Sequence, residues 1–358
     1  MFNKLKNLIM KQNRDAIGLD IGTSSIKLAE VVWQKERPLL KNLGIVALPE
    51  KLMGEGLFSD AGLLTELIRN LLATSGAVSS NVVAAIGSRT VFIREVLFPA
   101  MSAEELKEAV KWDMEKYVPY EPDSYYYDFA VVGPGETDLE LKILLTAAPK
   151  ENVNELVTVL KNSGLKPRIV DIEPLALLST LSGADNAVIV DIGGMFSQVI
   201  LFQQGSPVVA RAIPLGGNRF TEVIRQSLEL PWAEAEHLKQ RQQGLLQRVD
   251  AAGKDASEIH QQMELLVNEL AREVQRTIEY YRIQHKAAAV EKIFLAGGGA
   301  RLANLAPYLA AQMDIPLTVH DPFGAVETAA SFDRQYLAEI APQYAVALGL
   351  ALRGGVSL

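Results

Sequence analysis

The chain has 358 residues, 49% of them hydrophobic, which is enough for at least two domains with sizeable cores. The formal net charge of −8 disfavours nonspecific nucleic-acid binding by the whole surface. The absence of cysteine excludes disulfides, zinc–thiolate sites and thiol catalysis, and it fits a reducing cytoplasm. No charge-free apolar run reaches the roughly 18 residues that a membrane span requires.

Residues 1–14 form a basic amphipathic segment. They contain four basic residues and no acid, and apolar residues recur at helical spacing: Phe2, Leu5, Leu8 and Ile9. One interpretation is a terminal helix packed on the body of the protein. The other is an interfacial helix whose Met1–Lys11 stretch rests on anionic lipid or on a partner. The segment is too short in its apolar part for a secretory signal.

The rest of the chain contains two related halves. Each begins with a strand-like run, 16–19 and 187–190, that ends in the phrase Asp-Ile-Gly at Asp20 and Asp191. In each half two further strand-like runs follow, separated by turn residues, and then a helix, about Asp60–Thr74 and Arg219–Leu228. We therefore expect two duplicated α/β lobes, residues 15–185 and 186–338, each built on a mixed five-stranded core sheet. Residues 339–358 should form a helix that returns to the first lobe.

Each half carries an insertion. In the first, Ser102-Ala103-Glu104-Glu105 predicts a capped helix through Tyr117, and an aromatic run, a strand and a second helix follow. This α+β unit is expected to span about 98–166. In the second half, about 229–290 should be largely helical. The last strand signal, 292–296, runs into a glycine triplet before the helix expected at 302–313.

The two Asp-Ile-Gly turns and the glycine triplet predict a nucleotide site between the lobes. Glycine lets backbone N–H groups approach phosphate oxygens, and carboxylates are suitable partners for hydrated Mg²⁺. One such turn alone is a weak signal, because a polar strand end has the same sequence. Two copies at matching positions are a stronger one. A P-loop pattern and a complete dinucleotide fingerprint are both absent from the sequence.

In the order and spacing of these motifs the chain resembles the actin/Hsp70/sugar-kinase ATPase superfamily. The first and second phosphate motifs match at 20–25 and 191–194, the adenosine motif at 295–300, and the two connecting helices at 172–176 and 345–351. The insertion lies where the FtsA family carries its own subdomain. Five details are more similar to the PilM family of type IV pilus assembly proteins: the basic start, 98–101, 115–119, 170–174 and 273–277.

The resemblance implies roles for individual residues. Asp20 and Asp191 would hold Mg²⁺ through water, and Glu173 would orient an attacking water, although an acid at a helix start needs no such role. Lys27 would contact phosphate or lie exposed on its strand. Residues implied to contact ATP are Gly22, Thr23, Ser24, Ser25, Lys27, Gly193, Gly194, Gly217, Asn218, Glu273, Arg276, Gly297, Gly298 and Gly299. Glu273 and Arg276 are equally compatible with a surface ion pair.

The resemblance also implies a function. It predicts a cytoplasmic, ATP- and Mg²⁺-binding component of the type IV pilus inner-membrane assembly platform, peripheral to the membrane, with at most slow ATPase activity. Its expected partner is the N-terminal cytoplasmic peptide of PilN, held between the first lobe and the insertion near Tyr117 and Tyr120. Other platform proteins and the assembly motor are further expected partners. The alternatives are an FtsA-like filament-forming ATPase and a sugar-kinase-like phosphotransferase.

Overall fold

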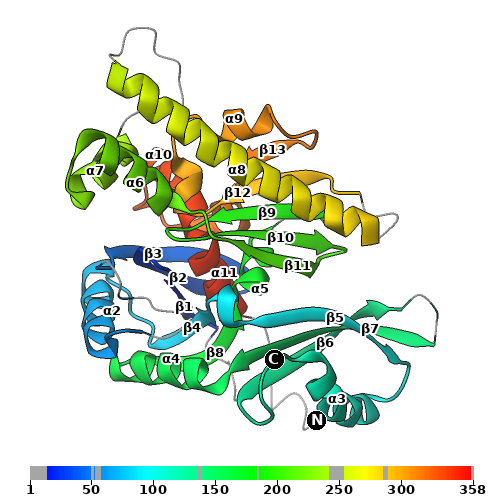
Figure 1. Cartoon of the computed structure of the whole chain (residues 1–358). Coiled ribbons are helices and arrows are strands. Elements are labelled where there is room, and N and C mark those ends of the chain that lie inside the picture. The colour runs from blue at the N-terminus through cyan, green and yellow to red at the C-terminus, as the bar shows by residue number, and fades with distance from the viewer. Residues whose placement is uncertain are drawn as a thin grey trace.

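The computed structural model describes residues 14–355 except 50–51, 53–57, 136, 138, 182, 184, 242–253 and 285–288. The Met1–Lys11 segment therefore lies outside the described residues. Two sheet-centred lobes lie one above the other, and a smaller module extends from the lower one (Figure 1). No helix in the described part of the chain is long and apolar enough to cross a membrane.

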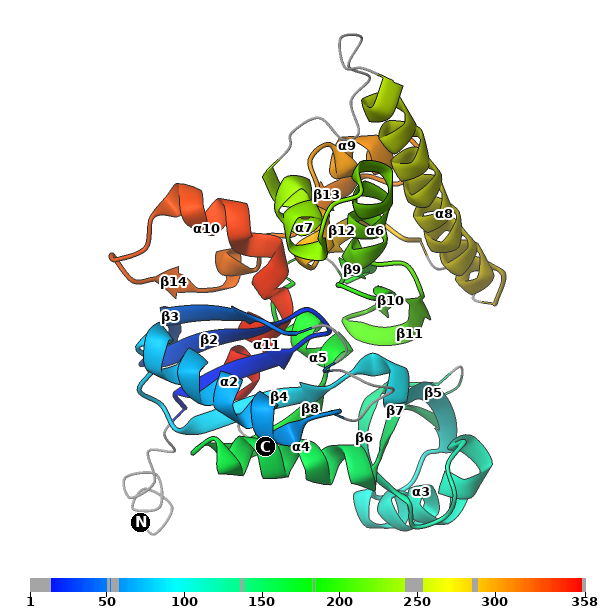
Figure 2. The ribbon, with the colours of Figure 1, turned by 60° about the vertical axis from the view of Figure 1, so that its left-hand side comes forward.

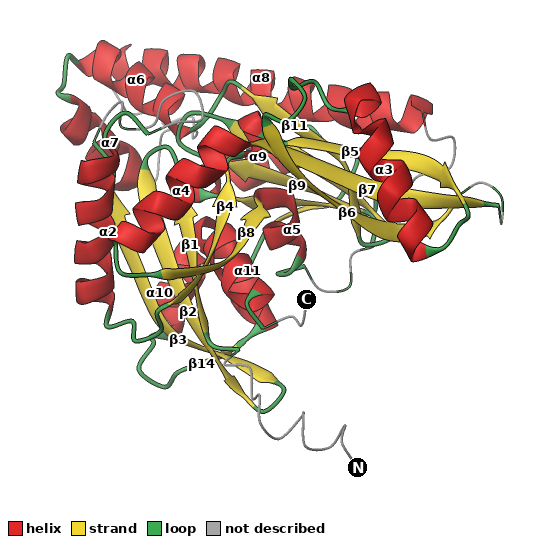
Figure 3. Ribbon diagram, turned by 90° about the horizontal axis from the view of Figure 1, so that it is seen from below, coloured by secondary structure: helices red, strands yellow, loops and turns green. Residues whose placement is uncertain are grey.

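The first lobe is built on a sheet with the strand order β14-β3-β2-β1-β4-β8. Its strands are β1 (Ala16–Ile21), β2 (Ser25–Gln34), β3 (Arg37–Ala47), β4 (Asn81–Ile86), β8 (Lys166–Ile172) and β14 (Glu327–Thr328). Helices α2 (Ala61–Ser75) and α4 (Lys150–Asn162) cover one face, and α11 (Ala345–Arg353) covers the other (Figure 3). The central strand β1 is therefore buried on both sides, which explains the apolar run Ala16–Leu19 with which it begins.

The second lobe is built on a sheet with the order β11-β10-β9-β12-β13. Its strands are β9 (Ala187–Ile192), β10 (Ser197–Gln203), β11 (Ser206–Ile213), β12 (Lys292–Ala296) and β13 (Leu317–Val319). The helices that pack with it are α6 (Gly217–Leu228), α7 (Trp232–Arg241), α8 (Lys254–Gln284) and α9 (Leu305–Ala310), with a 3₁₀ turn η2 (Gly298–Arg301) after β12.

The duplication expected from sequence is present in the backbone. In both lobes the first three strands pair antiparallel, and the next core strand runs parallel to the first. The turn after the first strand is also the same. Gly22 N donates to the Ser25 carbonyl at 3.1 Å, and Gly193 N donates to the Phe196 carbonyl at 2.9 Å. The two Asp-Ile-Gly phrases therefore form equivalent hairpins.

The inserted module is a three-stranded antiparallel sheet covered by one helix. It contains β5 (Phe92–Pro99), β6 (Tyr125–Pro134), β7 (Glu140–Pro149) and α3 (Ala103–Tyr117), joined to β4 by the 3₁₀ turn η1 (Ser88–Thr90). Ser102 and Glu105 form the expected capping box. The module spans 92–149 rather than 98–166. The helix α4 packs its apolar residues Leu156, Val159 and Leu160 into the core of the first lobe instead.

Two helices connect the lobes, as expected. In α5 (Glu173–Leu178), the Ala176 carbonyl lies so close to α11 that a Cβ on Gly349 would be 1.9 Å from its oxygen. Only glycine permits this crossing. The segment before α11 also packs on the first lobe through Phe323, Leu337 and Ile340 (Figure 2). It comprises η3 (Pro322–Ala325), β14, α10 (Arg334–Ile340) and η4 (Ala341–Tyr344). The second lobe therefore ends near β13, before the expected boundary at 338.

Candidate functional site

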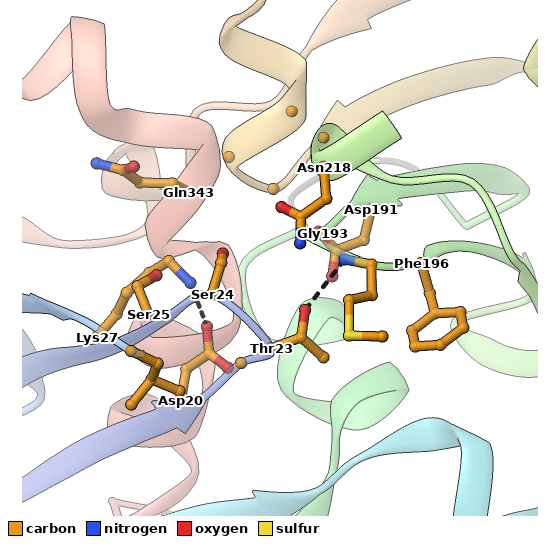
Figure 4. Close-up of a pocket in the computed structure, with 18 of the residues that line it drawn as sticks. Asp20, Thr23, Ser24, Ser25, Lys27, Asp191, Gly193, Phe196, Asn218 and Gln343 are labelled. Atoms are coloured by element: carbon orange, nitrogen blue, oxygen red, sulfur yellow. Dashed lines mark hydrogen bonds and ion pairs between the residues drawn. The ribbon is translucent and has the colours of Figure 1, made fainter. Parts of the chain in front are cut away.

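A cavity of about 1560 Å³ lies between the two lobes, with both hairpins on its walls. Figure 4 shows Asp20, Thr23 and Lys27 of the first hairpin opposite Asp191, Gly193 and Asn218 of the second lobe. Seventeen residues were expected to form the site, and the cavity lining includes all of them except Glu273 and Arg276. Those in the lining are Asp20, Gly22, Thr23, Ser24, Ser25, Lys27, Glu173, Asp191, Gly193, Gly194, Gly217, Asn218, Gly297, Gly298 and Gly299.

Strand register brings Asp20 and Lys27 together. The two residues face each other across the β1–β2 pair, and Lys27 Nζ lies 3.0 Å from Asp20 Oδ2. Asp20 is only 8% exposed, so a lysine partner offsets the cost of its charge. Lys27 thus points into the cavity and not to solvent. The second lobe repeats this register, with Asp191 opposite Gln198. The amide of Gln198 thus takes the position that the amine of Lys27 has in the first lobe.

Three carboxylates face this region from both lobes. Burial raises the pKa of Asp191 to about 7, and the negative charges of Glu173 and Asp20 add to the increase, whereas Lys27 opposes it. Such a concentration of negative charge favours a divalent cation. Among the described residues no group of three ligand side chains is close enough to hold a metal directly. Asp20 and Asp191, which lie on opposite walls, would hold Mg²⁺ through its water ligands.

The two hairpins touch each other at the centre of the cavity. Met195 N donates to Thr23 Oγ1 at 3.1 Å, from the second lobe to the first. A Cβ on Gly194 would lie 2.8 Å from Ser24 Oγ and 2.9 Å from Thr23 Oγ1. A side chain at 194 would therefore have to displace the side chains of Ser24 and Thr23. The close approach also brings hydroxyls from one lobe beside the backbone of the other, an arrangement suited to a chain of phosphates.

Glu173 begins α5 and lines the cavity. Its Oε2 accepts a hydrogen bond from Gln198 Nε2 of the second lobe. The contact fixes the direction of the carboxylate toward the region of Asp191. Gln198 is a site residue that the sequence did not single out, because on a strand it looks like an ordinary polar position.

The glycine triplet forms the opposite wall. Gly297 has φ +81°, and its N–H donates to the Pro342 carbonyl at 2.7 Å. A Cβ on Gly299 would lie 2.2 Å from Ile192 Cγ2, whereas a Cβ on Gly298 would meet no atom within 4 Å. Gly298 therefore presents bare backbone to the cavity, and its two neighbours hold the turn against the second phosphate hairpin.

Glu236 and Lys239 of α7 also line the cavity, and sequence reasoning missed them. Lys239 Nζ donates to Glu236 Oε2 at 2.7 Å, to Thr221 Oγ1 at 2.8 Å and to the Gly217 carbonyl at 3.1 Å. Burial lowers the pKa of Lys239, against the effect of the Glu236 charge. The available signal was an i,i+3 Glu–Lys pair closely following the Gly-Gly-x-x-Phe-Thr turn at 216–221.

Glu273 and Arg276, by contrast, are not brought to the cavity. Arg211 Nη2 donates to Glu273 Oε2 at 2.5 Å, and Arg276 lies 3.7 Å from Glu273 with a 74% exposed side chain. The helix α8 packs its apolar face on the second sheet, so these two residues turn toward β11 and solvent. The expected contact of Glu273 and Arg276 with ribose or adenine therefore has no support in the geometry, and the surface ion pair is what the structure contains.

The fold and cavity define a class of protein: an actin-like ATPase fold with two duplicated lobes and a nucleotide-sized cleft. A family model for "Type IV pilus assembly protein PilM" matches residues 18–355. The chain belongs to this family.

Individual relatives agree with the family. A chain of a solved PilM–PilN type IV pilus biogenesis complex is 31% identical, with a TM-score of 0.83 over 96% of this chain and 99% of that one. Cell division protein FtsA of Bacillus subtilis is 25% identical over 260 residues. That match covers 65% of this chain and 59% of FtsA, so the chain spans less than two thirds of this relative.

A more distant likeness shows the fold alone. MreB5 of Spiroplasma citri, solved with AMPPNP, is 16% identical with a TM-score of 0.52 over 94% of this chain and 95% of that one. These comparisons, together with the two sheets and the inserted module, confirm the expected actin-like fold class.

Proposed function

We propose that this chain binds Mg–ATP between its lobes and serves as a component of the inner-membrane platform that assembles type IV pili. The observation that carries the nucleotide assignment is the pair of equivalent hairpins. They bring Asp20 and Asp191 to one cavity from opposite lobes, with Thr23 and Ser24 against Gly194. An actin-like neighbour, MreB5, solved with AMPPNP supports the same ligand class.

ATP is proposed to act mainly as a structural or switching ligand. A nucleotide bridging the two hairpins stabilises the closed arrangement in proportion to its higher affinity for that state. Glu173, held by Gln198, is the residue proposed to position water for slow hydrolysis. Isothermal titration with Mg–ATP tests the assignment, and an Asp20→Asn, Asp191→Asn double variant should abolish Mg²⁺-dependent binding. Binding that is unchanged in this variant would disprove the cleft assignment.

The proposed partner is the N-terminal cytoplasmic peptide of PilN, supported by the 31% identical PilM–PilN complex. We place it at the junction of α4 and β6, where the module meets the first lobe. There Tyr126 Oη donates to Asn154 Oδ1 at 3.2 Å, and Lys150 Nζ lies 5.6 Å from the Tyr126 ring centroid. Tyr126 is 47% exposed, and tyrosine combines apolar area with a hydroxyl at low entropy cost.

Tyr117 and Tyr120, the aromatic residues first expected to contact the peptide, are engaged in contacts within the protein, Tyr117 inside the module and Tyr120 with η1. Tyr117 packs on Phe98 with ring centroids 6.2 Å apart, and Tyr120 Oη donates to the Thr90 carbonyl. Point variants therefore test the partner site better than deletion of 98–166, which would remove α4 from the first core. We expect Tyr126→Ala to weaken binding of a fluorescent PilN peptide. The control is Tyr280→Ala, an exposed tyrosine of α8 in the other lobe.

Within this proposal the protein acts on the cytoplasmic side of the inner membrane. Other platform proteins and the assembly motor are further partners, and Met1–Lys11 assists recruitment to anionic lipid. The likeness to FtsA favours one alternative, a filament-forming ATPase. Sedimentation with Mg–ATP separates the two: a filament pellets, whereas a platform subunit stays in the supernatant.

A further inference from the structure

The inserted module carries most of the net charge of the chain. Residues 92–149 contain twelve acidic and five basic residues, a net charge of −7, whereas the whole chain has −8. The same module holds six of the fifteen exposed large apolar residues in the described part of the chain: Leu97, Trp112, Tyr126, Tyr127, Val131 and Leu139. A surface that is both acidic and apolar is complementary to a partner that is basic and apolar.

Trp112 lies on the outer face of α3, and 77% of the residue is exposed. The apolar residues on the opposite side of the helix pack into the module core. Glu104 and Glu108 lie eight and four positions before Trp112, and Glu115 lies three positions after it, so all four residues share one side of the helix. The three glutamates are also exposed. We call these four residues the Trp112 face.

The three lysines of α3 lie along the edges of the Trp112 face. Lys116 Nζ lies 2.6 Å from Asp113 Oδ1 and forms an ion pair with it. Lys107 and Lys111 lie along the other edge. Lys111 is three positions after Glu108 and four before Glu115, so it offsets part of their charge. With Lys111 counted, three carboxylates still face one amine, and the Trp112 face keeps a net negative charge.

The segment of this sequence that matches such a surface is residues 1–14. It has four basic residues and no acid, and its sequence predicts an amphipathic helix with an apolar face of Phe2, Leu5, Leu8 and Ile9. The apolar face is complementary to the Trp112 indole, and the basic residues are complementary to the three glutamates. An indole ring also attracts lysine and arginine through cation–π contacts.

The point where this segment joins the first lobe lies apart from α3. Arg14 Nε donates to the Gly355 carbonyl at 2.8 Å, and Arg14 Cζ lies 4.3 Å from the centroid of the Trp33 ring. In Figures 2 and 3, strands β4 and β8 and the sheet of the module lie between β1 and α3. A helix of 13 residues spans only about 20 Å. The segment of a second copy is therefore better placed to reach α3 than the segment of the same chain.

We propose that the Trp112 face of α3 binds the N-terminal segment 1–14 of a second copy of this chain. The contact joins different surfaces of the two copies, so it is heterologous and builds an open chain or a closed ring. The segment uses the same apolar face for anionic lipid in the proposed function, so lipid and α3 compete for it. This self-association depends neither on nucleotide in the cleft nor on the PilN peptide.

The first experiment measures binding of a fluorescein-labelled peptide of residues 1–14 by fluorescence anisotropy. The receptor is the full chain with Leu5→Glu, because a charge on the apolar face makes its own segment a weak competitor. We expect Trp112→Ala in this receptor to weaken peptide binding roughly tenfold or more, as truncation of a central aromatic anchor does. Glu108→Lys should also weaken it, and added salt should weaken binding to the unaltered face.

Helix α10 offers matched controls for both substitutions. Tyr336 is 50% exposed, and Glu339 is an exposed acid three positions later on the same helix. Tyr336→Ala and Glu339→Lys in the same receptor should keep the affinity for the peptide. Since Trp112 and Glu108 are exposed as well, thermal unfolding should show all four variants folded.

The second experiment follows self-association by sedimentation velocity over a range of protein concentrations without nucleotide. Wild type should sediment faster as its concentration rises, and Trp112→Ala should remain monomeric. A chain with Glu104→Lys and Glu108→Lys should also remain monomeric. Adding Lys4→Glu and Lys6→Glu to that chain should restore association, because the charges of the segment and of the helix are then exchanged.

Each contrary result overturns the inference. Failure of the Leu5→Glu receptor to bind the peptide would exclude a site for the segment on this protein. Peptide binding that survives both Trp112→Ala and Glu108→Lys would place the segment elsewhere. Peptide binding that requires Trp112, with wild type monomeric at every concentration, would show that the segment docks on α3 of its own chain. None of these results bears on the cleft or on the PilN peptide, which their own titrations test.

Discussion

Gly298 provides a sharp test of the cleft, because its substitution separates ligand binding from stability. A Cβ at this position meets no atom within 4 Å, and the residue is exposed at the cavity wall. A valine should therefore fit the empty protein without strain. With nucleotide bound, the same side chain occupies ligand space, and such overpacking costs about 1–3 kcal/mol. Since about 1.4 kcal/mol is tenfold, Gly298→Val should weaken Mg–ATP binding by roughly 5- to 150-fold.

Two glycines serve as controls for this prediction. Gly324, in η3, also has no atom within 4 Å of an added Cβ, but it lies outside the cavity lining. Gly324→Val should keep wild-type affinity. Gly299→Val should lose stability instead, because its Cβ would start 2.2 Å from Ile192 Cγ2. At about 2–4 °C for each kcal/mol, the melting temperature of Gly299→Val should fall by several degrees.

The assay is isothermal titration with Mg–ATP, together with thermal unfolding in the absence of nucleotide. Gly298→Val should have the melting temperature of wild type and bind Mg–ATP weakly. A Gly298→Val protein that is folded and binds Mg–ATP like wild type would refute the reasoning, since the backbone of the triplet could not then face the ligand.

Three further predictions concern the carboxylates and the N-terminal segment. Glu173→Gln should slow any ATP hydrolysis about tenfold or more while ATP affinity is retained; an unchanged rate in a phosphate-release assay would leave Glu173 only a helix-start role. The pKa of Asp191 is raised to about 7 in the folded protein. At pH values between the ordinary pKa of an aspartate and 7, Asp191 therefore carries a proton in the folded protein but not in the unfolded chain. The melting temperature of the nucleotide-free protein should therefore be higher at pH 6 than at pH 8. The affinity for Mg–ATP should instead fall as the pH drops below 7. Asp191→Asn should flatten the pH dependence of both the melting temperature and the affinity. Liposome flotation with anionic lipid should recover wild type, and Phe2→Glu or Leu5→Glu should reduce the recovered fraction; no flotation of wild type would favour the packed terminal helix.

Local patterns in the sequence were sufficient for much of the fold. Because β1 is buried on both faces, it begins with a run of apolar residues, and the turn that follows it contains glycine. Both features are local, so the Asp-Ile-Gly phrase could be recognised from sequence in both halves. The helix start at Ser102 could also be predicted from sequence, because a capping box is made by residues three positions apart. The seventeen expected site residues were placed by such motifs, and fifteen of them lie around one cavity.

Tertiary structure decided what depends on contacts between distant segments. The helix α4 looks like part of the insertion in the sequence, but the first core has the complementary apolar surface, so it packs there. Glu273 and Arg276 form an ion pair on a helix, and no local signal says which face of α8 turns to the cavity. Glu236, Lys239, Gln198 and Arg89 enter the site because α7, β10 and η1 are carried there by the two sheets. Periodicity and turn chemistry determine elements, whereas the direction in which a polar side chain points is set by what the rest of the chain packs against it.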